Sequence, residues 1–159
     1  MPGSRFLPIL KTLARYEVEY IVVGGVAAVL RDAPVSTFDL DVVHSTAADN
    51  VVRLKSALEE LDGVYPFQPE RQLRPEISHL GSPGPQLLMT RWGPLGVLGA
   101  IGEGRGYPQL VEHAPEVTLG EGLRVRVLDL ATQIAVKEET GGEKDRAVLP
   151  LLRRVLEES

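Results

Sequence analysis

The sequence contains no cysteine among its 159 residues. This absence excludes disulfide bonds, metal sites built on thiolates and cysteine nucleophiles, and it permits a reducing compartment. No apolar run approaches the roughly 18 residues that a membrane span needs. The first twenty residues also lack the clean apolar segment and small-residue cleavage site of a leader peptide. We therefore expect a cytoplasmic protein with no membrane partner.

Basic residues are outnumbered, since 17 lysines and arginines stand against 22 aspartates and glutamates and give a formal net charge of -5 at pH 7. This balance argues against a broad basic surface for nucleic acid and leaves only local contacts. Apolar residues make up 43% and charged residues 25% of the chain, which is typical of a folded domain. The length suits one hydrophobic core. We predict a single domain over 1–159, with its core at about 18–100 and a C-terminal hairpin and helices at about 115–158.

The spacing of apolar residues predicts an α+β fold. Apolar residues at helical intervals indicate helices, and short β-branched runs bounded by glycine or proline indicate strands. Expected helices cover residues 5–15, 26–31, 46–62, 130–139 and a last segment from 143. Expected strands cover residues 19–23, 37–43, 77–80, 86–90, 95–101, 117–119 and 123–128. This order predicts a mixed β-sheet flanked by helices and followed by C-terminal helices.

Two aspartates stand inside the apolar run "FDLDVV". On a strand, side chains two residues apart face the same side, so Asp39 and Asp41 are expected to project together. Adjacent carboxylates repel each other unless a cation lies between them. Magnesium suits this arrangement, because Mg²⁺ binds one or two protein carboxylates together with substrate phosphates and water. The simpler interpretation of such a pair is an exposed strand or a site for ion pairs.

A glycine pair precedes the aspartates, with thirteen residues between Gly25 and Asp39. Gly24 and Gly25 end an apolar strand and allow the backbone to turn sharply and approach a ligand closely. Backbone N–H groups at the start of the following helix favour phosphate oxygens. A glycine pair after a strand is by itself usually only a turn. In combination, the two motifs predict a phosphate cradle and a metal site that face one ligand.

This pattern resembles the signature of the polymerase β-like nucleotidyltransferase superfamily. More closely, it is similar to small bacterial nucleotidyltransferases related to abortive-infection toxins. The resemblance is strongest over residues 20–43. The C-terminal segment is also similar to the helices of that group, in which a lysine is followed by a Lys-Asp pair. The matching residues here are Lys137, Lys144 and Asp145.

The resemblance implies transfer of a nucleoside monophosphate from a nucleoside triphosphate to a hydroxyl of a protein, tRNA or small molecule. Two Mg²⁺ ions would take part, and pyrophosphate would leave. A cognate toxin–antitoxin partner is implied as well. The simpler interpretation of the two lysines is a solvated helix face or a local ion pair. The implied site comprises Asp39 and Asp41 as metal-binding and catalytic residues, Lys137 as a catalytic residue, and Gly24, Gly25 and Lys144 as nucleotide-binding residues.

The sequence departs from the family at the third acid. Three carboxylates normally share the metals, and the third lies in the hairpin that corresponds to "LLMTRWGPLGVLG", where this chain has Gly96. Glycine offers no side chain to bind metal or accept a proton. Glu103 is a candidate replacement, although its spacing does not require it to reach the site. The departure favours an alternative function, namely a catalytically reduced module of the same fold that binds nucleotide or protein.

Overall fold

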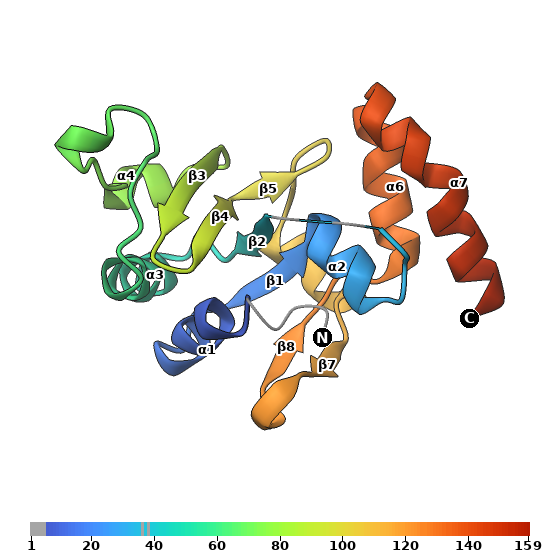
Figure 1. Ribbon diagram of the computed structural model, residues 1–159, viewed down its shortest axis with the longest axis horizontal. Coiled ribbons are helices and arrows are strands. Elements are labelled where there is room, and N and C mark those ends of the chain that lie inside the picture. Colours follow the sequence, from blue (N-terminus) through green and yellow to red (C-terminus); the bar gives the residue numbers. More distant parts are fainter. Residues whose placement is uncertain (1–5, 36, 38) are drawn as a thin grey trace.

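A four-stranded mixed sheet lies at the centre of the molecule (Figure 1). The computed structural model describes residues 6–35, 37 and 39–159, with the side chains of 143–145 outside this description. β2 runs antiparallel to β1 and parallel to β4, and β3 pairs antiparallel with β4. The strands, in their order across the sheet, are β1 (Tyr20–Val23), β2 (Leu40–His44), β4 (Gly93–Leu98) and β3 (Pro85–Thr90). The α+β fold with a mixed sheet is therefore confirmed.

One face of the sheet is buried under two helices, α1 (Leu7–Arg15) and α3 (Ala48–Glu60). Side chains alternate along a strand, so every second residue points to this face. The strand residues that pack there are Tyr20, Val22, Leu40, Val42, Leu88, Leu95 and Val97. The helix residues that cover them include Ile9, Leu10, Leu13, Val51, Leu54 and Leu58. This face holds most of the apolar core.

The other face of the sheet carries Asp41 and is only partly covered. Near one end of the sheet, Ile21 and Val43 pack beneath α5 (Tyr107–Leu110), and Leu128 joins the same cluster. A small second sheet of β5 (Ala100–Ile101) and β6 (Arg105–Gly106) lies beside this cluster. Toward the edge strand β3 the face is open to solvent, as the 61% exposure of Leu87 on this face indicates. Asp41 thus lies between a covered end and an open edge.

The C-terminal part of the chain returns to the sheet before it forms the last two helices. The hairpin of β7 (Glu116–Thr118) and β8 (Arg124–Arg126) leads into a segment that runs beside β1, where the N–H of Leu128 donates to the Val22 carbonyl at 3.0 Å. α6 (Leu130–Thr140) then packs against α7 (Glu143–Glu158) and α2 (Gly24–Leu30), as Figure 1 shows. Residues Ala28, Leu130, Ile134, Leu149 and Leu152 form the core between these helices.

Three segments differ from the prediction. The strand predicted over 37–43 begins only at Leu40, so Asp39 precedes it and does not lie on the strand with Asp41. Residues 77–80 form the helix α4 (Ile77–Leu80) and not a strand. The reason is local, because the N–H of Glu76 donates to Nδ1 of His79 at 2.9 Å and caps a single helical turn. The strand predicted over 95–101 is also divided at Gly99, so that its end becomes β5. Single turns of 3₁₀-helix complete the fold at Pro69–Arg71, Val111–His113 and Gly120–Gly122.

Candidate active site

The turn from β1 into α2 brings the backbone against a carboxylate. Gly24 opens α2 with a φ of +69°, in the left-handed region that glycine adopts without strain. A Cβ atom at this position would lie 2.9 Å from Oδ2 of Asp41. Glycine is therefore required both for the turn and for the close approach. At Gly25, a Cβ atom would lie 2.6 Å from Oγ1 of Thr37, so this position is equally crowded.

The two aspartates lie at the start of β2. The strand begins at Leu40, so exposed Asp39 immediately precedes it, and half-buried Asp41 lies within it. Burial, together with the negative charge of Asp39, raises the pKa of Asp41 to about 6. The ionised form of Asp41 is therefore disfavoured by its surroundings. A cation beside the two carboxylates would offset this penalty.

Gly96 lies directly beside Asp41 on the neighbouring parallel strand. The two residues are partners in the β2–β4 register. A Cβ atom at Gly96 would overlap Oδ1 of Asp41 and lie 3.4 Å from Cδ2 of Leu87. A side chain at this position would therefore project into the aspartate site, where the family resemblance implies a third carboxylate. Among the side chains that the structure describes, no group of three or more His, Cys, Asp or Glu residues is assembled.

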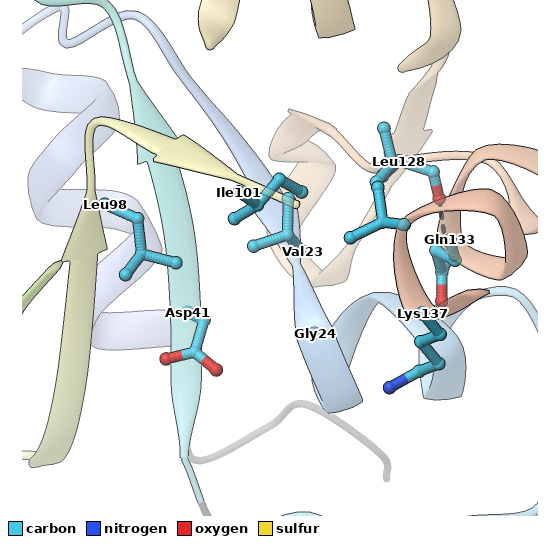
Figure 2. A pocket seen from close by; sticks show the side chains of 9 residues that line it. Val23, Gly24, Asp41, Leu98, Ile101, Leu128, Gln133 and Lys137 are labelled. Atoms are coloured by element: carbon cyan, nitrogen blue, oxygen red, sulfur yellow. Dashed lines mark hydrogen bonds between the residues drawn. The ribbon is translucent and has the colours of Figure 1, made fainter. Parts of the chain in front are cut away.

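A cavity of about 190 Å³ connects the aspartate site with α6 (Figure 2). Gly24 and Asp41 line one side, and Lys137 lines the other. Figure 2 shows the Lys137 side chain extending from α6 toward the Gly24 side of the cavity. The apolar part of the lining comprises Val23, Leu98, Ile101, Leu128 and Val136. The fold thus brings together a glycine turn, a carboxylate and a lysine from distant parts of the sequence.

Gln133 also lines this cavity, and the sequence analysis missed it. Its side chain is 4% exposed, and Nε2 donates to the Leu128 carbonyl at 2.8 Å. The only available signal was its position one helical turn before Lys137, which places both residues on one helix face. That spacing is too common on helices to indicate a site.

Of the predicted site residues, Gly25 and Asp39 are absent from the cavity lining. Two further candidates are not brought to the cavity by the described side chains either. The Lys144 side chain lies outside the described residues, so its role toward phosphate stays a prediction. Glu103 is exposed, and its backbone N–H donates to Oε1 of Glu139 on α6 at 3.2 Å. Nε of Arg105 donates to Oε2 of the same glutamate at 3.1 Å. These bonds hold the β5–β6 turn against α6, and Glu103 is absent from the cavity lining.

Asp39 and Asp41 are the residues that could hold Mg²⁺. Carboxylate oxygens are ligands that Mg²⁺ takes, and the ion leaves coordination positions for phosphate and water. The raised pKa of Asp41 fits this ligand set, because a cation would stabilise its ionised form. Gly96 supplies no third carboxylate. The donor set therefore suits one Mg²⁺ that arrives with a triphosphate better than a second, separately bound ion.

Known proteins resemble this chain in structure and not in sequence. No protein-family profile matches the sequence, and no curated protein matches it either. A Thermotoga maritima protein assigned as a nucleotidyltransferase has a TM-score of 0.59 at 16% identity, covering 97% of this chain and 91% of that one. The lincosamide antibiotic adenylyltransferase LnuA, solved with lincomycin bound, has a TM-score of 0.63 at 14% identity, covering 95% and 96%.

A third solved structure, the antibiotic-resistance factor ANT(2'')-Ia, has a TM-score of 0.63 at 15% identity and covers 98% of this chain and 86% of that one. At these identities the likeness shows the fold alone. The chain shares the fold of these nucleotidyltransferases, in agreement with the resemblance noted in its sequence. The relation to abortive-infection toxins and the toxin–antitoxin partner stay predictions. Within the described part of the chain, no helix combines the length and apolar character that crossing a membrane requires.

Proposed function

We propose that this protein transfers a nucleoside monophosphate from a nucleoside triphosphate to a hydroxyl group, with Mg²⁺ bound at Asp39 and Asp41. One observation carries the proposal, namely that Gly24, Asp41 and Lys137 line a single cavity. The nucleotidyltransferase fold supports it. The glycine turn lets triphosphate oxygens approach the backbone, and the Lys137 ammonium group offsets their negative charge. The acceptor is a protein, a tRNA or a small molecule.

In this reaction, the acceptor oxygen forms a bond to the α-phosphorus, and the bond from that phosphorus to the β-phosphate oxygen breaks. Pyrophosphate leaves with the electron pair of the broken bond. Bound Mg²⁺ would stabilise the charge that develops on the phosphate oxygens. Asp39 and Asp41 would hold this ion. Because Gly96 offers no base, the hydroxyl proton passes to solvent, and we expect slow transfer that accelerates as the pH rises.

The test is transfer of label from α-³²P nucleoside triphosphates in the presence of Mg²⁺. All four nucleotides are tried against three acceptors: the protein itself, bulk tRNA and lincomycin, the molecule bound by one structural neighbour. Labelling by the wild type that is lost in Asp39→Asn and Asp41→Asn supports the proposal. Asp32→Asn is the matched control, because Asp32 is exposed and lies at the far end of α2. Labelling that persists in both site variants contradicts the proposal.

Gly96 favours a second candidate function, a module that binds nucleotide without transferring it. The glycine is in register with Asp41 on the neighbouring parallel strand, and a side chain there would project against the Asp41 carboxylate. This candidate predicts Mg²⁺-dependent nucleotide binding with no transfer to any acceptor. The Cβ of Gly96→Asp displaces the Asp41 carboxylate, as any substitution there must, but the new carboxylate replaces the lost ligand and supplies a base. Gly96→Asp should then introduce transfer, because a general base typically accelerates such reactions by about 10² to 10⁴-fold. Gly96→Asn is the matched control, since it adds similar bulk without a base.

A further inference from the structure

Gln133 is a buried amide in the α6 wall of the cavity. Figure 2 shows its hydrogen bond to the Leu128 carbonyl, in which Nε2 donates at 2.8 Å. A carbonyl oxygen can only accept a hydrogen bond, so this contact identifies the nitrogen end of the amide. Oε1 is therefore the other end of a side chain whose orientation is fixed.

Oε1 of Gln133 has no hydrogen-bond partner among the described residues. Buried carbonyl groups are nearly always paired, because an unpaired one loses its bond to water without replacement. The neighbouring cavity walls are apolar and offer no side-chain donor at Val23, Leu98 or Ile101. An unpaired acceptor beside an apolar cavity indicates that a ligand brings the donor. The oxygen is fully covered here, so neighbouring side chains shift when that ligand enters.

We propose that Oε1 of Gln133 accepts a hydrogen bond from the nucleoside part of the bound triphosphate. This inference rests on the proposed function. The cavity runs from Gly24 and Asp41, where the phosphates are placed, to Gln133 on α6. The Lys137 side chain, one turn after Gln133, extends from α6 toward Gly24, where the phosphates are placed, and the apolar walls suit the faces of a base.

The group that donates to Oε1 of Gln133 must be an N–H or an O–H group. Two parts of a nucleoside carry one, namely the ribose hydroxyls and the hydrogen-bonding edge of the base. Both are joined to the same phosphates and share the same chemistry toward an amide oxygen. Removing each donor separately from the nucleotide distinguishes them.

The experiment measures nucleotide affinity by calorimetry for the wild type and for Gln133→Met, which keeps the length of the side chain and removes the acceptor. The ligands are the tightest-binding of the four nucleoside triphosphates with Mg²⁺, its 2′-deoxy and 3′-deoxy forms, and a base analogue lacking the edge donor. We expect Gln133→Met to bind the parent nucleotide about tenfold more weakly, the loss of one hydrogen bond. Thr132→Val, a buried polar residue of α6 that does not line the cavity, is the control.

The analogues form a chemical double-mutant cycle with the substitution. The analogue that lacks the relevant donor should bind the wild type about tenfold more weakly than the parent, and should bind Gln133→Met with the same affinity as the parent. If Gln133→Met does not fold, the analogue series on the wild type decides the matter. Equal binding of all analogues by the wild type, or unchanged affinity in a folded Gln133→Met, overturns this inference and leaves the proposed function standing. No nucleotide binding by the wild type overturns the proposed function as well.

Discussion

Asp41 is the residue on which the site depends. It is flanked by two glycines, because a Cβ atom at either Gly24 or Gly96 would come into close contact with its carboxylate oxygens. These two glycines leave room for the carboxylate, and neither has a side chain that could donate a hydrogen bond to it. This environment explains why burial is the first cause of its raised pKa, ahead of the charge of Asp39.

The pKa of Asp41 makes stability depend on pH in a defined direction. The unfolded state releases its proton near the ordinary value of 3.8, whereas the folded state retains it to about 6. Stability contributed by this residue therefore falls as the pH rises from about 4 to about 6 and stays constant above. Replacement by asparagine removes this loss. Because Asp41 is partly exposed, we expect the stability difference between Asp41→Asn and wild type to grow by about 1 to 2 kcal/mol between pH 4 and pH 7.

Urea denaturation of both proteins at the two pH values, without divalent cations, measures this difference. Asp32→Asn serves as the control for removal of an exposed carboxylate. A difference between Asp41→Asn and wild type that stays the same at pH 4 and pH 7 would contradict the assignment of the raised pKa to Asp41.

Gly96 yields a second prediction at this scale. In Gly96→Ala the added methyl group would overlap Oδ1 of Asp41, so the carboxylate must rotate away from its present position. We expect Mg²⁺-dependent nucleotide affinity to fall by about tenfold, because one metal ligand is displaced. Calorimetry on Gly84→Ala provides the comparison, since a Cβ atom at Gly84 meets only Oγ of Ser82, at 3.8 Å. Equal affinity in the two variants would show that Asp41 does not need its present orientation.

The residues of the site differed in how far the sequence could predict them. The spacing of Gly24 and Asp41 indicated a shared ligand, and the cavity does bring them together. Gln133 could not be found in this way. Its importance depends on a missing hydrogen-bond partner, and that depends on how α6 packs against the sheet.

At the scale of elements, α6 positions Gln133, Val136 and Lys137 in the cavity wall. Its first turn is capped by Asp129, whose Oδ1 accepts a hydrogen bond from the N–H of Thr132 at 2.8 Å. We expect Asp129→Ala to destabilise the protein by about 1 kcal/mol, because a backbone donor loses its partner. Asp129→Ser should retain most of the stability, since serine also caps helices. Thermal unfolding of the three proteins tests this, and equal melting temperatures would argue against the cap.

Elements with a strong pattern were predicted well, and short ones were not. The continuous burial of β1 and the helical spacing of α3 follow directly from their apolar residues. Residues 77–80 are too few to show either period. The hydrogen bond from the N–H of Glu76 to the His79 side chain favours a helical turn there. β4 ends just before Gly99, where the backbone of Ser82 approaches so closely that a Cβ atom on residue 99 would overlap it.

At the scale of the whole molecule, the site lies where the N-terminal sheet meets the C-terminal helices. The sequence indicated which segments contribute, and the packing of α6 against α2 required the structure. The prediction of a single domain over 1–159 stays a prediction. Since Asp41 comes from the sheet and Lys137 from α6, a ligand in the cavity contacts both parts of the fold.

This arrangement predicts stabilisation of the entire fold by ligand. Binding at one hundred times the dissociation constant stabilises a folded protein by about 2.7 kcal/mol. For a chain of this size, we expect the melting temperature to rise by about 5 to 11 °C with Mg²⁺ and nucleotide together. Either component alone should produce a much smaller shift, because the metal and the triphosphate complete each other's coordination. Differential scanning fluorimetry with each component and with both measures this effect.

The measurement that tests the central claim most directly is a calorimetric titration of the protein with ATP, GTP, CTP and UTP, each with and without Mg²⁺. The Asp39→Asn/Asp41→Asn double variant is titrated in parallel. We predict binding of at least one nucleotide that requires Mg²⁺ and is lost in the double variant. Binding that survives the double substitution, or no binding of any nucleotide by the wild type, would contradict a metal–nucleotide site at these two aspartates.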